Sequence, residues 1–215
     1  MKIMTLKNKV QFLILVVFIL TLAITLTINA YPLYVFDIGH LGIEEMTGLT
    51  KGTLLSNYHQ LMGYLNHPFI KTLKMDDFPV SESGAFHFYE VKRLFILNYA
   101  LLIVTSIPAV CFVKQLWQSN RLWIIKQALA YTALVPVILG FVMLVAFDQV
   151  FIAFHHLMFN NDAWLFDPVT DPVIMALPEQ YFFHCFALAV ILFEAIILAL
   201  FFKSKHQLKK LRTLN

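Results

Sequence analysis

The sequence predicts an all-α integral membrane protein, a four-transmembrane-helix bundle with a small extracellular cap formed by two outer loops. Three observations predict this class. The chain is 60% hydrophobic and only 13% charged, whereas soluble domains carry about 25% charged residues. Four segments are each about 20 mostly apolar residues long, as a helix that crosses a bilayer requires. Basic residues gather at one end of these segments. For 215 residues we expect a single membrane domain, 1–215.

The first apolar segment runs from about 10 to 30 and has no charge between Lys9 and Asp37. It is longer than the apolar core of a cleaved signal peptide, roughly 7–15 residues, and is therefore predicted to be a retained helix. Cys111 and Cys185 are expected near opposite membrane surfaces, too far apart for a disulfide. The other predicted spans are about 94–113, 122–147 and 181–202.

The distribution of Lys and Arg predicts the orientation of these spans. Positive residues concentrate on the cytoplasmic side of membrane proteins, so both termini are expected in the cytoplasm and segments 31–92 and 148–180 outside. The basic C-terminal tail is expected to attract anionic membrane lipids. Because topology explains the basic residues, nucleic acid is excluded as a partner. The cytoplasmic set is Lys2, Lys7, Lys9, Lys114, Arg121, Lys126, Lys203, Lys205, Lys209, Lys210 and Arg212.

The two outer loops are longer than simple connections, and long ordered loops are usually functional. Apolar residues at helical spacing over 54–65 predict a helix in the first loop. The sequence Ser81-Glu82-Ser83-Gly84 predicts a turn, with the next helix beginning near Ala85. Short strands are plausible around Phe78-Pro79-Val80.

Histidines are concentrated on the predicted outer side, and the helix register selects two of them. The second and third spans are joined by a short link and should be antiparallel neighbours. His87 and Asp148 lie equally far from this link along their helices. His155 follows Asp148 by one heptad, on the same helical face. We therefore expect His87, His155 and Asp148 to converge at the outer interface.

This convergence is suited to acid–base chemistry. Histidine is the usual general base at neutral pH, and a carboxylate can fix its tautomer. His156 points about 100° away from His155 on a helix, so only one of them should face the site. The remaining outer histidines are interpreted as interfacial side chains that only form hydrogen bonds: His40, His59, His67 and His184.

Several catalytic motifs are absent from the chain, including GxSxG, HExxH, CxxC and the phosphate-binding P-loop. The adjacent pair His155-His156 lacks the i,i+4 spacing of helical zinc ligands. No metal and no other cofactor is therefore expected. Two alternatives to an enzyme that uses these histidines for acid–base chemistry stay open: a non-enzymatic membrane docking or receptor subunit, and a metal-dependent membrane hydrolase that uses the outer histidines.

The chain resembles the bacterial lipoprotein intramolecular transacylases (Lit), a four-span family of Gram-positive bacteria, over essentially its whole length. Four groups of residues carry the resemblance. They are Asn57-Tyr58 through Leu61-Met62 to Tyr64-Leu65-Asn66; His87 with Glu90-Val91-Lys92; Phe154-His155 leading to Phe159-Asn160-Asn161-Asp162-Ala163-Trp164; and Asp171-Pro172 with Leu177-Pro178-Glu179. The family pattern often has Asp where Glu90 stands.

The resemblance implies a substrate and a reaction. The substrate would be a diacylglyceryl lipoprotein, whose sn-2 acyl chain moves onto the α-amino group of its N-terminal cysteine, giving the lyso-form. The site would lie at the outer leaflet of the bacterial plasma membrane. His87 and His155 would be the family's paired catalytic histidines, with either one as the base and His156 as an alternate. The supporting candidates are Asp148, Glu90, Asn57, Tyr58 and Trp164.

Overall fold

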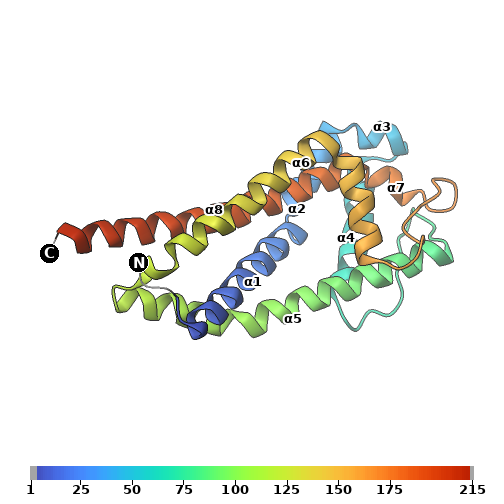
Figure 1. Ribbon diagram of the computed structural model, residues 1–215. Coiled ribbons are helices and arrows are strands. Elements are labelled where there is room, and N and C mark those ends of the chain that lie inside the picture. The colour runs from blue at the N-terminus through green and yellow to red at the C-terminus, as the bar shows by residue number, and fades with distance from the viewer. Residues whose placement is uncertain (1–3, 214–215) are drawn as a thin grey trace. The chain divides into compact units, whose positions relative to one another are not determined.

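Four long helices dominate the computed structural model, which describes residues 4–213. Each contains an apolar stretch long enough to cross a membrane, and no strand occurs among the described residues (Figure 1). The predicted fold class, an all-helical chain with four spans, is therefore confirmed. The four are α1 (Leu6–Ile28), α5 (Glu82–Gln118), α6 (Lys126–Met158) and α8 (Glu179–Thr213), with the 3-10 turn η1 (Leu122–Ile125) preceding α6.

The long helices extend beyond the apolar segments. Helix α5 has 37 residues, whereas about 20 suffice to cross a bilayer. It begins at Glu82, three residues before the position expected from the sequence. Its first turns carry His87, ahead of the apolar segment 94–113. Helix α6 extends in the same way past residue 147 and carries His155 in its last turn.

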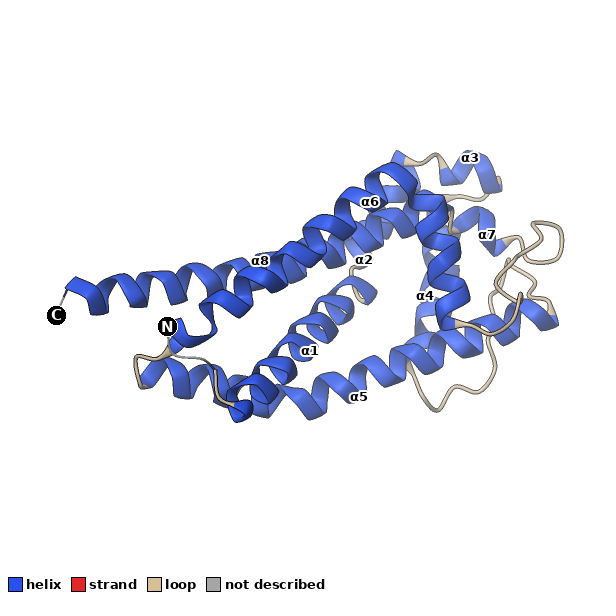
Figure 2. Cartoon of the chain, viewed as in Figure 1, coloured by secondary structure: helices blue, strands red, loops and turns tan. Residues whose placement is uncertain are grey.

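Short helices occupy much of the two segments expected to be outer loops (Figure 2). They are α2 (Tyr31–His40), α3 (Ile43–Thr47), α4 (Lys51–Asn66) and α7 (Val173–Ala176). Helix α4 confirms the helix predicted over 54–65. Its N-cap is Thr50, whose hydroxyl accepts a hydrogen bond from the Thr53 amide at 3.3 Å.

The short strands expected around 78–80 are not formed, and this expectation was wrong. The segment is irregular. Pro79 has no N–H to give to a strand partner, and the following Ser81 amide donates to the Asp171 carboxylate at 2.8 Å. The chain here is therefore held by a side-chain contact to the second loop and not by a sheet.

The chain divides into two compact units. Unit 1 takes in the residues up to Thr27, Asn98–Val145 and the chain from Ala187 onward; unit 2 takes in Ile28–Leu97 and Ala146–Phe186. The boundaries fall inside α5, α6 and α8. Ala146 in α6 has non-helical dihedral angles, φ −145° and ψ 49°, at the start of its unit 2 portion. The single domain expected over 1–215 stays a prediction.

Unit 1 is built from apolar side chains of α1, α5, η1, α6 and α8. Ile19, Phe112 and Ile197 are among its fully buried residues. Two amide side chains supply polar links between its segments. Asn98 donates to the Thr25 hydroxyl at 2.8 Å, and Gln207 accepts from the Leu122 amide at 2.7 Å. Hydrogen bonds of this kind stabilise helix packing where lipid replaces water.

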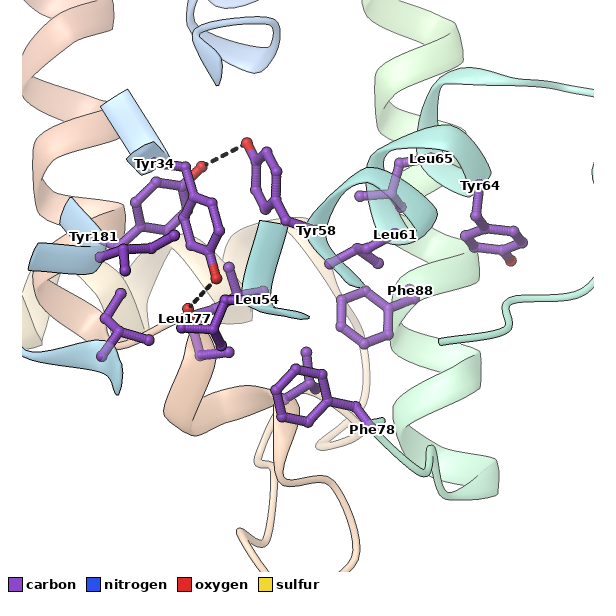
Figure 3. Close-up of a cluster of buried hydrophobic side chains, with 14 residues drawn as sticks. Tyr34, Leu54, Tyr58, Leu61, Tyr64, Leu65, Phe78, Phe88, Leu177 and Tyr181 are labelled. Atoms are coloured by element: carbon purple, nitrogen blue, oxygen red, sulfur yellow. Dashed lines mark hydrogen bonds between the residues drawn. The ribbon is translucent and has the colours of Figure 1, made fainter. Parts of the chain in front are cut away.

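Unit 2 has an aromatic core that joins α2, α4, α7 and α8 (Figure 3). The rings of Tyr34 and Tyr58 stack with centroids 4.0 Å apart. The Tyr58 and Tyr181 hydroxyls are 3.0 Å apart, and the Tyr34 hydroxyl donates to the Ala176 carbonyl at 3.1 Å. Each buried phenol thus has a hydrogen-bond partner, which offsets the cost of burying it.

Candidate active site

Two histidines from different helices lie next to each other in unit 2. His87, from the first turns of α5, and His155, from the last turn of α6, have ring centroids 5.8 Å apart. Their side chains are 7% and 8% exposed. Register counting predicted that these two residues would meet, and the structure brings them together.

Aromatic rings enclose the pair. His155 stacks on Trp164 with centroids 4.6 Å apart and an interplanar angle of 28°. His87 contacts Phe159 and Phe166 through edge-to-face arrangements, at 4.8 Å and 5.5 Å. Such surroundings penalise a charged imidazolium and favour the neutral ring. The site is therefore suited to a histidine that accepts a proton during a reaction.

The tautomer of His155 follows from its hydrogen bond. Its Nδ1 lies 2.7 Å from the carbonyl oxygen of Phe151, one helical turn earlier. A carbonyl can only accept, so Nδ1 must carry the hydrogen. In the neutral ring Nε2 then has a free lone pair. A backbone carbonyl thus does for His155 what a carboxylate does in a catalytic triad.

Two buried polar atoms at the site have no hydrogen-bond partner within residues 4–213. They are Nδ1 of His87 and the indole Nε1 of Trp164. A buried polar group left without a partner costs about 1–3 kcal/mol, so most are satisfied in folded proteins. Both belong to rings that contact His155. Each nitrogen is therefore free to bond to a group that enters the site.

The second loop is tied to α5 by two carboxylates. Asp171 is 2% exposed, and its carboxylate accepts from both the backbone amide and the hydroxyl of Ser81, at 2.8 Å and 2.7 Å. Asn161 donates its amide to both carboxylate oxygens of Glu90, at 3.0 Å and 3.1 Å. These bonds hold the loop that carries Trp164 against the first turns of α5.

The other predicted site residues lie outside this pair. Asp148 lies close enough to Glu179 to raise the pKa of that carboxyl and makes no described contact with the histidines. His156 is exposed and touches only the edge of Trp164, at 5.4 Å, which leaves His155 as the histidine that faces His87.

Asn57 and Tyr58 belong to the scaffold of unit 2. Asn57 donates to the Asp77 carboxylate at 2.7 Å and accepts from the Asp77 amide at 3.1 Å. Burial raises the pKa of Tyr58 to about 12, so its hydroxyl keeps its proton in the bond with Tyr181. Both residues hold α4 in place, and neither contacts the histidine pair through the bonds described.

Sequence reasoning missed an acid–histidine pair in unit 2. His184, which had been interpreted as an interfacial side chain, has its Nδ1 2.8 Å from the carboxylate of Asp37, whose side chain is fully buried. Burial raises the pKa of Asp37, and the hydrogen bond with His184 opposes the rise. The two residues are 147 positions apart, and nothing local in the sequence pairs them.

The four apolar helices define a polytopic membrane protein, and its buried histidine pair is of the residue type that most often serves as a general acid or base. The model of a known family, lipoprotein intramolecular transacylase Lit, matches residues 9–182. The chain belongs to this family of membrane-integral acyltransferases. None of the curated proteins compared with the chain matches it.

Solved structures of a relative agree with this assignment. The in meso structure of the membrane-integral transacylase Lit from Bacillus cereus is 26% identical to this chain and superposes on it with a TM-score of 0.87. The match spans 96% of this chain and 98% of the Bacillus cereus protein. Two further structures of that protein carry a single histidine substitution, to arginine in one and to alanine in the other. Both are 25% identical to this chain and superpose with TM-scores of 0.80. The match to the arginine variant spans 97% of this chain and 95% of the variant. The match to the alanine variant spans 96% of each.

Proposed function

We propose that the chain moves the sn-2 acyl chain of a diacylglyceryl lipoprotein onto the α-amino group of that lipoprotein's N-terminal cysteine. The product is the lyso-form, which carries an N-acyl and a monoacylglyceryl group. One observation supports this above the others: in a member of the transacylase family, His87 and His155 lie next to each other in an aromatic, buried site. Both reacting groups belong to one substrate, so positioning alone can supply a large part of the rate.

His155 acts as the base in this proposal. Its Nε2 removes a proton from the attacking amine, while Nδ1–H stays bonded to the Phe151 carbonyl. The amine nitrogen forms a bond to the ester carbonyl carbon, which becomes a tetrahedral oxyanion. When the oxyanion collapses, the bond to the glycerol sn-2 oxygen breaks. The imidazolium returns its proton to that oxygen, and an amide and an alcohol result.

His87 and Trp164 supply hydrogen bonds to the oxyanion. In the tautomer protonated at Nδ1, His87 offers an N–H that no described protein group uses, and the Trp164 indole offers a second. Donors already aimed at the position where negative charge develops stabilise it without reorganisation. Since the amine attacks the ester directly, no acyl-enzyme is needed, and the absence of a nucleophile motif is consistent with this.

The membrane setting is also part of the proposal. We infer that both termini lie in the cytoplasm and that the histidine pair lies at the outer leaflet, because the basic residues concentrate at the opposite ends of the spans. An acyl chain can then reach the site sideways from the leaflet in which the lipoprotein is anchored.

Mass spectrometry of a lipoprotein's N-terminal peptide, from cells with and without the protein, tests the reaction. The protein should convert a diacylglyceryl peptide with a free amine into an N-acylated monoacylglyceryl peptide. His87→Ala and His155→Ala should each lower conversion by about 10²–10⁴-fold, the usual contribution of general acid–base groups. His156→Ala is the matched control and should keep full activity.

Either of two results would contradict the proposal. One is an unchanged peptide in cells that contain the folded protein. The other is full conversion by a well-folded His155→Ala variant, which would remove His155 from the reaction even if the acyl transfer itself were observed.

A further inference from the structure

An apolar cavity of about 390 Å³ lies within unit 1. Helix α1 contributes Leu15 and Ile19 to its wall, α5 contributes Val113, and α8 contributes Leu200. This volume is in the range of sites that bind small molecules. The apolar wall indicates a hydrocarbon occupant.

Two lysines line the same cavity, Lys114 from α5 and Lys203 from α8. Both side chains are exposed. The ion pair that the structure shows within residues 4–213 joins His184 and Asp37, so neither ammonium has a carboxylate within 4.0 Å. The cavity therefore has an apolar body and two unneutralised positive charges in its lining.

A hydrogen-bonded turn fixes the segments that carry these lysines. Gln207 lies one helical turn after Lys203. Its side chain accepts from the Leu122 amide at 2.7 Å and donates to the Trp117 carbonyl at 3.4 Å. Trp117 follows Lys114 by three residues and also lines the cavity. The two cations and an indole ring are thus held around one opening by contacts inside unit 1.

We propose that this cavity binds an anionic phospholipid, with one acyl chain against the apolar wall and the phosphate between Lys114 and Lys203. Basic pockets between membrane helices bind anionic headgroups, and tryptophan favours the headgroup level of a bilayer. A second copy of the chain fits poorly, because it would bring its own lysines toward these two. The wall belongs to unit 1 and the histidine pair to unit 2, so the site is separate from the transacylation chemistry.

Native mass spectrometry of the full chain released from detergent micelles tests the proposal. The probes are phosphatidylglycerol and phosphatidylcholine with identical acyl chains. Phosphatidylglycerol should be retained at least tenfold more often, as one molecule per chain. The double variant Lys114→Gln/Lys203→Gln should lower its retention to that of phosphatidylcholine. Lys209→Gln/Lys210→Gln removes the same charge from residues outside the cavity lining and should retain phosphatidylglycerol as the wild type does.

A third variant separates the cavity from the charges. Val113→Phe places a ring in the cavity and keeps both lysines, so it should lose the retained lipid. Equal retention of the two lipids by the wild type would overturn the proposal, as would equal losses in the two double variants. A specific dimer without retained lipid would replace the phospholipid with a second copy as the occupant.

Thermal unfolding of the wild type provides a measurement that needs no variant. A ligand that binds only the folded state raises its stability, so phosphatidylglycerol should raise the Tm in detergent more than phosphatidylcholine does. Equal Tm values with both lipids would count against the site, whether or not the variants fold.

Discussion

At the scale of single residues, the tautomer of His155 is fixed by a bond that needs no second ionisable group. The Phe151 carbonyl fixes its Nδ1–H, and the stacked Trp164 ring covers one of its faces. The sequence predicted a carboxylate, Asp148, in this role. Residues 147–158 continue as helix, so the roughly 10 Å between the levels of Asp148 and His155 remains, at a rise of about 1.5 Å per residue.

The indole nitrogen of Trp164 provides a test of the oxyanion site. Trp164→Phe keeps an aromatic ring against His155 but removes the buried N–H. We expect kcat for acyl transfer to fall by about 10²–10³-fold, the usual cost of losing one oxyanion donor, with little change in KM. Steady-state kinetics with a synthetic diacylglyceryl peptide in micelles measures both constants.

Trp123→Phe is the control for this prediction, because it makes the same chemical change in η1 of unit 1. It should leave kcat unchanged. A Trp164→Phe enzyme with the wild-type kcat would show that the indole N–H takes no part in the reaction and that its role is limited to packing.

At the scale of single elements, the sequence was most informative where the signal is local. The four spans were predicted because membrane crossing depends on a continuous apolar run, and α4 because its apolar residues recur at helical spacing. The helices α2, α3 and α7 were not predicted. They have 10, 5 and 4 residues, and helices this short are marginal without tertiary packing. Tyr34 in α2 shows that packing, since it is buried against Tyr58 and Tyr181.

The start of α5 depends on close contact with Asp171, and a glycine substitution tests it. A Cβ added at Gly84 would lie 2.2 Å from the Asp171 Oδ1 atom, which the Ser81 bond already holds. We expect Gly84→Ala to lower the free energy of unfolding by about 1–3 kcal/mol, the usual cost of overpacking. It should also lower activity, because His87 lies less than one turn further along the helix. Thermal unfolding in detergent and the peptide assay measure these effects.

Gly63 provides the matched substitution. It lies inside α4, and a Cβ there meets nothing within 4 Å. Gly63→Ala should raise stability by about 0.5–1 kcal/mol, because alanine loses less conformational freedom than glycine on forming a helix. If both substitutions changed stability equally, the contact between α5 and Asp171 would not be the cause.

The Asp37–His184 pair joins α2 to α8 and makes stability depend on pH. Burial raises the pKa of Asp37 above its ordinary 3.8, so the folded state holds this proton more tightly than the unfolded state does. The free energy of unfolding should therefore fall as pH rises from 3.8 through the raised pKa. Asp37→Asn cannot titrate and should lack this contribution. His184 and His40 are the titratable neighbours that lower the pKa of this carboxyl, against the effect of burial.

The difference in Tm between the wild type and Asp37→Asn, measured from pH 3.5 upward, isolates the carboxyl from other titrating groups. His184→Phe removes the hydrogen bond that opposes the rise in the Asp37 pKa. In that variant the fall in stability with rising pH should therefore extend to a higher pH than in the wild type. A Tm difference that stays constant with pH would show that Asp37 titrates alike in both states.

At the scale of the whole molecule, the distribution of charge is the feature that the sequence states most directly. Charges close to apolar segments set the orientation of a membrane protein during insertion. The pairing of His184 with Asp37 cannot be seen in the sequence in this way, because it depends on chain segments that meet only in the folded protein. The family and its span number could thus be predicted from the sequence, whereas the pairing of Asp37 with His184 could not.

The predicted orientation can be tested with single cysteines in a variant in which Cys111 and Cys185 are replaced by alanine. Val169→Cys places a thiol in the second loop, where the native side chain is 85% exposed. Ser119→Cys places one at the exposed turn between α5 and η1. In intact cells a membrane-impermeant maleimide should label only the first, because Lys114, Arg121 and Lys126 hold the turn in the cytoplasm. The turn should be labelled only after the membrane is permeabilised. The reverse pattern would place the histidine pair on the cytoplasmic side, where a lipoprotein anchored in the outer leaflet could not reach it.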